Sequence, residues 1–548
     1  MRLINASSLQ LEWFMDHEQA PPYAILSHTW GDGEVTLQDF TSADRSAARS
    51  LAGFAKIELT CHQALKDGLS HAWVDTCCID KTSSAELSEA INSMYEWYKH
   101  SAICYAFLED LSADEPLTSG DDTSCTGFTK CRWFSRGWTL QELIAPETVQ
   151  FYDADWNLRG TKASLAHLLT AITRIEESVL RGETDIFTLP VASRMAWAAD
   201  RVTSRVEDIA YSLLGIFSVN MAMLYGEGRR AFIRLQEEIL RESNDTSIFA
   251  WKATGGSKTQ RLRGILAESP SEFAYAVGIK MTSDPRFDNE FAITNKGVRV
   301  EASTVIMGGR SILPLNCTLD GKVLGLYIVQ YGSRLYARDR PELMATQGDG
   351  QDWTAQWENT SSLPIYVSKT LSPALSATLE IAHRHGIHLR HGFAFSAQVG
   401  PNGRKFSDPL GTAIGVVSWI HPMHRWDMSR QLFLTKQGED FTALIMFGNE
   451  EMLGVLLAVG VADEEPWVSF IDAAEWRDKV SSHDQWDLRE AKRIGMELQA
   501  SKSKSAALRI TKDTLDGELV YCIDMVETAY EEPLLAIESP LLEGLFLE

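Results

Sequence analysis

The sequence has little cysteine, no long apolar run and no basic excess, and each shortage excludes a class of protein. Its eight cysteines are spread irregularly over 548 residues, unlike the dense framework of a small disulfide-stapled secreted domain, so we interpret them as reduced thiols. The first residues, MRLINASSLQLEWF, show no basic segment followed by an apolar one, so no secretory signal is expected. The most apolar segment, Met452 to Ala462, is shorter than the ~18–20 residues of a membrane helix. These features favour a cytoplasmic protein without a membrane span.

Charge excludes a further class. The formal net charge is −24, and proteins that bind phosphate backbones do so with clustered lysine and arginine, so nucleic acid is not an expected partner. The chain is rich in hydrophobic residues, which make up 45% of it, and these can form several folded cores. Its length predicts two to four domains of ~100–200 residues each.

The region from about Tyr23 to Trp156 alternates β-type runs with helical patterns, which is typical of an α/β domain with a mainly parallel sheet. In the first predicted helix, Ser83 and Glu86 have the spacing of a capping box. Pro146 is expected to end the second. The expected elements are strands at 23–30, 71–80, 103–110 and 148–156, helices at 81–102 and 133–145, and an exposed polar loop at 112–129.

The pattern changes twice beyond this region. Helical periodicity dominates to about Ile248, and TGGSKTQ, residues 254–260, has the composition of a linker. Alternating runs such as GVRVEAST and FTALIMFG then favour strands, arranged as one sandwich or two small sheets. The predicted organisation is therefore an α/β domain at 1–160, a helical continuation at 161–253 and a β-rich region at 261–548.

Glu142 is the sharpest catalytic candidate. It lies among tryptophans and leucines in SRGWTLQELIAP, where partial desolvation makes a carboxylate available to stabilise developing positive charge. Trp138 is four residues earlier, so on a helix the two side chains share a face and would flank a planar ligand. A solvated helix glutamate is the competing interpretation.

A second cluster follows the first strand, in SHTWGDGE. Ligands of open parallel sheets bind beyond the carboxyl ends of the strands, which makes this segment a candidate ligand-binding edge. The alternative is a Gly-Asp turn with a histidine at the end of the strand. The candidate ligand-binding residues are Ser27, His28, Trp30, Gly31 and Asp32.

A third cluster, WVDTCCIDK, carries Asp75, Cys77, Cys78 and Asp80 at the end of the second predicted strand. Asp75 joins the ligand-binding candidates. Adjacent cysteines lack the spacing of a structural zinc site, so buried thiols are favoured over a metal site.

Two other motifs are similar to a metal site and to a phosphate loop, but the residues around them disfavour both interpretations. The run HRHGIHLRH contains four histidines, but interleaved arginines repel a cation, so we favour a surface or interface segment over a metal site. YGEGRRAF lacks the lysine and hydroxyl of a phosphate loop and is interpreted as a helix start. No GxSxG or HExxH motif occurs, which excludes the commonest hydrolase signatures. We therefore predict no metal ligands; the histidines of the run are His383, His385, His388 and His391.

Three stretches occur in an order that is informative as a set. YAILSHTWGD, WVDTCCIDKTSSAELSEAINSMYEWYKHSAICYAFLEDL and WFSRGWTLQELIAP together resemble the fungal heterokaryon incompatibility (HET) domain. The later stretches RVTSRVEDIAYSLLGIF and MLYGEGRRAFIRLQEEI resemble its usual helical continuation. The resemblance covers roughly the first 250 residues.

The HET family is regarded as distantly similar to the Toll/interleukin-1 receptor (TIR) domain, so the resemblance implies a flavodoxin-like sheet wrapped by helices. SRGWTLQEL resembles the Ser-x-Trp-Cys-Leu-x-Glu-Leu helix motif of that group. In its enzymatic members the glutamate of this motif, Glu142 here, cleaves the bond between nicotinamide and ribose in NAD. The resemblance implies that Glu142 stabilises an oxocarbenium-like ribose, as carboxylates do in glycoside hydrolysis, and that Trp30 or Trp138 stacks on a ring.

The resemblance implies a protein that triggers regulated cell death in self/non-self recognition by consuming NAD as substrate, without a tightly bound cofactor. Its expected partners are further copies of itself or an incompatibility protein, and its C-terminal region would sense or regulate. The alternative is a non-enzymatic adaptor that signals by self-association.

Overall fold

The computed structural model is organised as two compact units. The first comprises Met1–Thr254, Leu266–Pro285 and Leu315–Val323, and the second comprises Gly255–Ile265, Arg286–Pro314 and Leu324–Glu548. The structure describes residues 1–117, 127–254, 260–282, 291–302, 305–307, 310–332, 334–347, 363–376, 385–389, 394–395, 416–422, 425–427, 431–435, 441–447, 455–462, 465–472, 506–515, 518–527 and 536–538.

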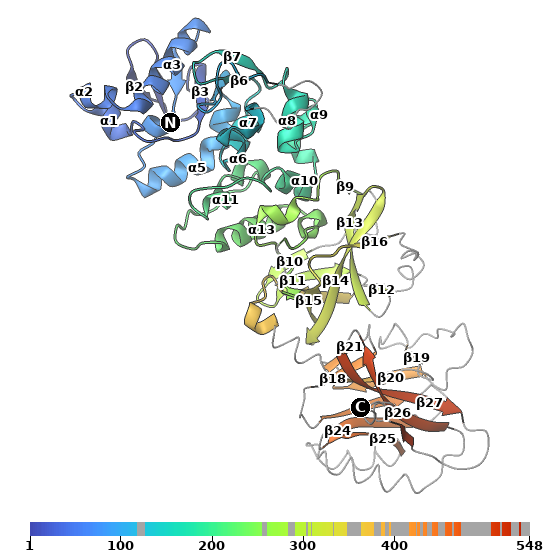
Figure 1. Ribbon diagram of the computed structural model, residues 1–548. Coiled ribbons are helices and arrows are strands. Elements are labelled where there is room, and N and C mark those ends of the chain that lie inside the picture. The colour runs from blue at the N-terminus through green and yellow to red at the C-terminus, as the bar shows by residue number, and fades with distance from the viewer. Residues whose placement is uncertain are drawn as a thin grey trace, which may run out of the picture. The chain divides into compact units, whose positions relative to one another are not determined.

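A seven-stranded sheet forms the centre of the first unit, in the order β2-β1-β4-β3-β5-β6-β7. It belongs to the blue to teal N-terminal part of the chain (Figure 1). The four inner strands β4, β3, β5 and β6 are parallel, as the sequence predicted, whereas β1, β2 and β7 add antiparallel edges that it did not. The strands are β1 (Arg2–Asn5), β2 (Gln10–Trp13), β3 (Tyr23–His28), β4 (His71–Trp73), β5 (Ile103–Phe107), β6 (Val149–Tyr152) and β7 (Leu158–Thr161).

The inner strands are apolar because helices cover them. All six residues of β3 and all five of β5 are buried, which matches the continuous hydrophobic runs of a parallel sheet. The helices of this region are α1 (Leu37–Thr41), α2 (Ser46–Arg49), α3 (Ala52–Lys66), α4 (Asp75–Cys78), α5 (Ser84–Lys99), α6 (Arg132–Ser135) and α7 (Thr139–Ile144), with the 3-10 turn η1 (Phe128–Lys130).

Helix α5 begins with half of the predicted capping box. The Ser83 hydroxyl accepts from the backbone N–H of Glu86. The Glu86 carboxylate instead accepts from Arg2 and from the backbone N–H of Asp80. The residue spacing predicted the helix start correctly, but a long-range arginine takes the carboxylate away from the cap.

Two predicted elements are wrong in their extent. The second strand was expected over 71–80, but β4 ends at Trp73 and the chain turns into α4 at Asp75. The helix expected over 133–145 is split into α6 and α7, because Arg136 adopts an extended conformation and forms a β-bridge with Val202. The split at Arg136 arises from a distant contact that local periodicity does not contain.

Helices and 3-10 turns continue the first unit beyond β7. Glu207 fixes the start of α13, since its carboxylate accepts from the N–H groups of Gly226 and Gly228, both at positive φ. YGEGRRAF is therefore a helix start, as predicted. The elements are α8 (Ala166–Thr173), α9 (Glu177–Leu180), α10 (Val191–Ala196), α11 (Asp208–Tyr211), α12 (Leu214–Phe217), α13 (Arg230–Glu242), η2 (Ile186–Thr188) and η3 (Thr246–Phe249).

The chain returns to the first unit after the expected linker. Gln236 of α13 donates to the carbonyl of Ala267 at 2.8 Å and accepts from its N–H at 2.9 Å. The backbone N–H of Lys252 donates to Glu272 in η4 (Pro270–Phe273). Residues on both sides of 254–260 are thus part of the same fold.

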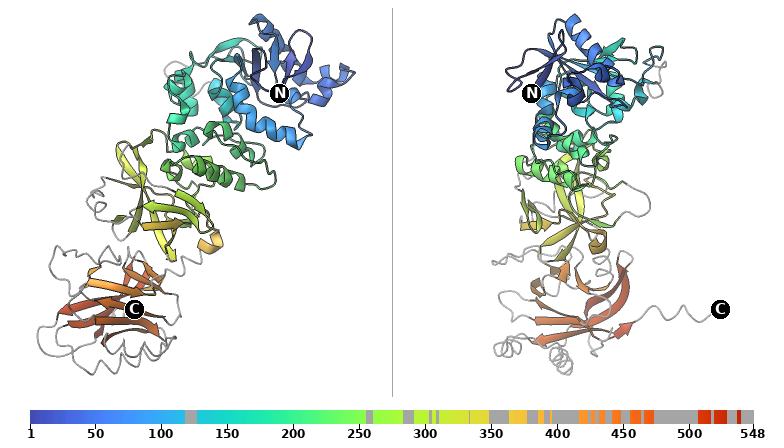
Figure 2. Two further views of the ribbon diagram at one scale, coloured as in Figure 1. Left: turned by 180° about the vertical axis from the view of Figure 1, so that it is seen from behind. Right: turned by 90° about the vertical axis from the view of Figure 1, so that its left-hand side faces the viewer.

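The second unit is rich in β-structure, as predicted. Its C-terminal strands form a six-stranded sheet, β21-β22-β18-β27-β26-β28, and a five-stranded sheet, β19-β20-β23-β24-β25. Buried residues of both sheets share one hydrophobic core, which gives a sandwich (Figure 2). These strands are β18 (His385–Leu389), β19 (Ala394–Phe395), β20 (Val416–His421), β21 (Trp426–Asp427), β22 (Leu432–Thr435), β23 (Phe441–Phe447), β24 (Val455–Ala462), β25 (Glu465–Asp472), β26 (Ala506–Leu515), β27 (Glu518–Glu527) and β28 (Ala536–Glu538).

A further sheet precedes the sandwich in sequence. Within the second unit, β11 pairs with β10 and β17, and β15 pairs in parallel with β17. The strands of this part of the chain are β8 (Leu262–Arg263), β9 (Lys280–Met281), β10 (Phe291–Thr294), β11 (Gly297–Ala302), β12 (Val305–Met307), β13 (Arg310–Leu319), β14 (Lys322–Gly332), β15 (Leu335–Asp339), β16 (Ala345–Thr346) and β17 (Leu363–Val367).

Two sequence segments are accounted for in this unit. The described part of the apolar segment at 452–462 is β24, paired on both sides. The histidine run was expected at a surface or interface, but its described part is β18, an inner strand whose Ile387 and Leu389 are in the core; His383 and His391 lie outside the described residues. Among the helices that the structure describes, none has the length and apolarity required to cross a membrane.

Candidate functional site

The end of β3 and the helix α7 meet through one short hydrogen bond. Ser27 is the next-to-last residue of β3. Its hydroxyl donates to Oε2 of Glu142 at 2.5 Å. Trp133 of α6 donates from its indole nitrogen to the same Ser27 oxygen at 2.8 Å. Two motifs separated by 115 residues of sequence are thereby joined.

Glu142 is desolvated, as its neighbours in the sequence predicted. The residue is only 7% exposed, and burial raises its pKa to about 7, although the Ser27 hydrogen bond opposes this shift. The nearby charge of Asp75 raises the pKa further, whereas Arg136 and Arg201 lower it. The carboxyl group therefore changes protonation state near neutral pH.

Asp75 contacts two of the candidate ligand-binding residues, His28 and Trp30. Its carboxylate lies 3.2 Å from Nε2 of His28 and accepts from the indole N–H of Trp30 at 3.0 Å. The ammonium nitrogen of Lys81 lies 3.5 Å from the same carboxylate and 3.5 Å from the centre of the Trp30 ring. Burial favours the neutral acid, but Lys81, His28 and Trp30 outweigh it and hold the pKa of Asp75 well below its usual range. Asp75 is therefore ionised at neutral pH.

Gly31 and Asp32 lie in the turn after β3. The N–H of Gly31 donates to Glu34 at 3.0 Å, and Glu34 also accepts from the buried Lys56 at 2.7 Å. Lys56 Nζ lies 3.5 Å from Nδ1 of His28, so this ion pair adjoins the Asp75 group. Asp32 is exposed.

The structure does not bring all candidates together. Trp138 precedes α7 as its N-cap residue, and its side chain lies close enough to Asp208 of α11 to oppose the rise that burial causes in the pKa of that carboxyl group. Asp80 accepts from Gln38 and Thr82. Cys77 and Cys78 are buried thiols, as predicted, but they lie in α4 rather than at the end of a strand.

Sequence reasoning missed several contributors to the site. Trp133 orients Ser27, Lys81 contacts both Asp75 and Trp30, and Arg201 donates to Thr139 at the start of α7. Trp133 and Lys81 belong to the sequence motifs quoted above, but their contacts become apparent only in the folded structure. Arg201 has no local signal in the sequence.

The site thus holds two carboxyl groups with opposite properties. Glu142 titrates near neutrality, so it can accept or donate a proton or a hydrogen bond. Asp75 stays negative and can stabilise positive charge. The partly exposed Trp30, 42% accessible, offers a ring face beside them.

Comparison with known proteins agrees with the motif resemblance. Residues 23–124 match the family model "Heterokaryon incompatibility protein (HET)". Residues 230–295 match a domain of unknown function, DUF8212, across the segment 254–260. No solved structure matches this chain.

A curated relative also matches. The vegetative incompatibility protein HET-E-1 of Podospora anserina is 47% identical over 220 residues, which is 40% of this chain and 16% of the relative. This chain thus spans about a sixth of the length of that protein. The family match covers β3, α4 and α5, the segments that carry Ser27, His28, Trp30 and Asp75. By these matches and the motifs, the N-terminal part of the chain is similar to the heterokaryon incompatibility (HET) domain.

Proposed function

We propose that this protein acts in incompatibility-type self/non-self recognition and that its N-terminal domain triggers cell death by cleaving NAD at the nicotinamide–ribose bond. The observation that carries the proposal is the Ser27–Glu142 hydrogen bond, which places a desolvated carboxyl group at the end of β3 beside the ionised Asp75. The order of the parallel strands, second-first-third-fourth in sequence, is also the order of flavodoxin-like sheets, which supports the TIR-like assignment.

The reaction proceeds as a glycosidic cleavage. The bond between the ribose carbon and the nicotinamide nitrogen breaks, and its electron pair leaves with the neutral nicotinamide. Glu142, freed from Ser27, accepts a hydrogen bond from a ribose hydroxyl, while the negative charge of Asp75 offsets the positive charge that develops on the sugar. Water then adds to the ribose carbon and loses a proton, which Glu142 can take because its pKa is about 7.

The hydrolysis is tested with purified full-length protein at high concentration, because self-association is part of the proposal. NAD is added to the parent, to Glu142→Gln and to Glu147→Gln, a matched control at an exposed position five residues on. Chromatography follows nicotinamide release, and circular dichroism compares folding. Release by the parent and by Glu147→Gln, with at least about a hundredfold loss in Glu142→Gln, supports the assignment.

A second candidate function is a non-enzymatic adaptor that signals by self-association. It is favoured by the burial of Glu142, since a carboxyl group that is 7% exposed and bound to Ser27 also serves to hold α7 against the sheet. If neither parent nor variant releases nicotinamide when clustered, and Glu142→Gln still kills cells, the adaptor replaces the enzyme.

A further inference from the structure

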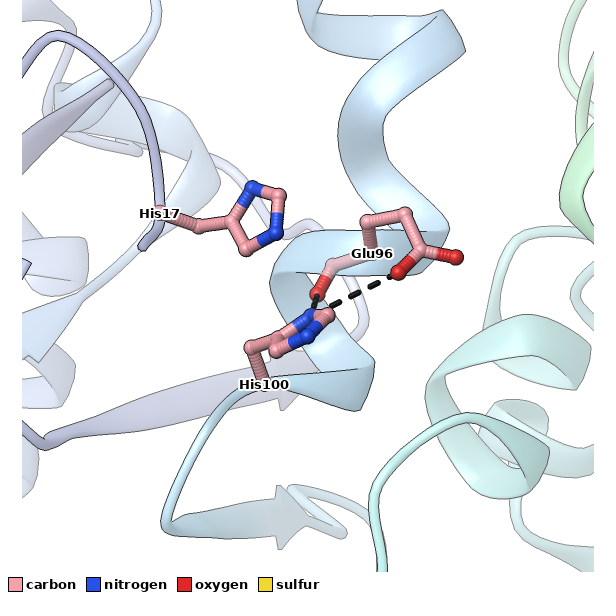
Figure 3. Close-up of side chains that lie close together, drawn as sticks. All are labelled: His17, Glu96 and His100. Atoms are coloured by element: carbon pink, nitrogen blue, oxygen red, sulfur yellow. Dashed lines mark hydrogen bonds and ion pairs between the residues drawn. The ribbon is translucent and has the colours of Figure 1, made fainter. Parts of the chain in front are cut away.

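A group of three metal-binding side chains lies at the C-terminal end of α5, apart from the residues described above. His17, Glu96 and His100 place one potential ligand atom each within 4.8 Å of one another. Glu96 and His100 are one helical turn apart, while His17 comes from the segment between β2 and β3 (Figure 3). Two separate parts of the chain therefore converge on this group.

The tautomer of His100 suits metal binding. Its Nδ1 lies 2.9 Å from the backbone carbonyl oxygen of Glu96. A carbonyl can only accept, so Nδ1 is the donor here; the same Nδ1 also lies 3.4 Å from Oε2 of Glu96, and Nε2 is the nitrogen left to bind an ion. Histidine ligands in metal sites are oriented by this kind of hydrogen bond from the other ring nitrogen.

The placement of His17 is the second observation. Its ring centre lies 4.3 Å from that of His100, with the ring planes 43° apart, so the two imidazoles are in direct contact although they come from separate segments. Asp16 and Glu18 flank His17 in the sequence and add negative charge. The ion pair of Glu96 with Lys99, at 3.4 Å and half exposed, is of the weak surface type that a metal ion can displace.

The ligand set defines the ion. Two imidazole nitrogens and one carboxylate oxygen suit zinc and similar divalent transition metals, whereas magnesium and calcium take oxygen ligands. The Glu96 and His100 side chains are 43% and 44% exposed, so the ion has direct access from solvent and a water can take the fourth position.

We propose that His17, Glu96 and His100 form an exchangeable zinc-type site that fastens the segment between β2 and β3 to the end of α5. Binding of the ion to the folded state alone stabilises the first unit. Small rotations of the exposed side chains bring the ligand atoms to the ~2.0–2.2 Å bond lengths of zinc.

The test uses full-length protein without a histidine tag, treated with a chelator and then titrated calorimetrically with zinc. The variants are His17→Ala, Glu96→Gln and His100→Ala. His167→Ala is the matched control, because His167 is an exposed histidine paired with a single carboxylate, Glu177, at 3.0 Å. The four histidines of the run at 383–391 are present in every protein, so their contribution cancels in the comparison.

The parent and His167→Ala are expected to bind one more zinc ion per chain than His17→Ala and His100→Ala, and Glu96→Gln to bind it at least about tenfold more weakly. Zinc should raise the thermal transition of the parent, and this rise should shrink in all three site variants. Equal zinc stoichiometry and equal thermal shifts in all five proteins would overturn the proposal. A loss in His167→Ala as large as in His17→Ala would do the same. Circular dichroism of the metal-free proteins establishes that the variants fold.

Discussion

Ser27 donates a 2.5 Å hydrogen bond to Glu142, and this contact fixes the helix α7 against the end of the central strand β3. It is supported on both sides. Trp133 donates to the Ser27 oxygen, and Arg201 donates to Thr139 in the first turn of α7. The geometry of Glu142 is therefore set by residues from the sheet, from α6 and from the helical continuation.

Glu142→Gln should make stability less sensitive to pH. Because burial raises the pKa of Glu142 from its ordinary value of 4.5 to about 7, the folded parent is favoured while the group is protonated and loses this advantage as pH rises from 4.5 to about 7. The loss is about 3 kcal/mol at most. Glutamine accepts from Ser27 without ionising. Urea unfolding at pH ~5 and ~8 should show the variant gaining on the parent at the higher pH, and a constant difference would contradict the shift.

Asp75→Asn should destabilise the first unit by about 1–3 kcal/mol at neutral pH, because charged hydrogen bonds to His28 and Trp30 and the ion pair with Lys81 are lost. The pKa of Asp75 is held low by these contacts, so the parent's advantage is present at neutral pH and fades as pH falls through that low pKa. Asp32→Asn, in the exposed turn, is the control and should change stability by less than about 0.5 kcal/mol. Thermal unfolding across the acid range measures both, and equal effects would refute the assignment.

Lys162→Met should loosen the end of α7. The buried ammonium of Lys162 donates to the carbonyls of Ile144 and Pro146, which lie at and just beyond the last turn of the helix. Its removal leaves these acceptors unsatisfied, and we expect a loss of about 1–3 kcal/mol. Lys66→Met, at the exposed end of α3, is the matched control. Hydrogen exchange of the α7 amides should accelerate in Lys162→Met alone.

Gly215→Ala should separate α12 from α5. A Cβ built at Gly215 would lie 2.1 Å from the Cβ of Tyr95, which neither backbone can accommodate without moving. A cost of about 1–3 kcal/mol is expected for such overpacking. Unfolding curves that match those of the parent would show that the helices have room to shift.

Local patterns predicted the parts of the site that depend on nearby sequence. Continuous apolar runs located β3 and β5, the position of Ser83 located the start of α5, and the hydrophobic neighbours of Glu142 indicated its burial. The NAD chemistry of Glu142 stays a prediction.

Long-range contacts account for what local patterns missed. The break at Arg136 depends on pairing with Val202, and the proximity of Trp138 to Asp208 of α11 has no signal in the sequence around Trp138. The antiparallel strand β1, between β2 and β4, pairs with β4 across more than 60 residues of sequence. Each of these outcomes needs a partner that a window of neighbouring residues does not include.

The paired hydrogen bonds between Gln236 and Ala267 bear on how such a gene can recombine. Because the chain leaves the first unit and comes back to it, a single crossover at codons 254–260 would combine α13 of one allele with the Ala267 segment of another. Such a hybrid keeps the contact only where position 236 retains an amide side chain that can donate to and accept from the backbone of residue 267. An exchange of the C-terminal sandwich that leaves the first unit whole therefore needs its junction downstream of residue 323, where the last returning segment ends.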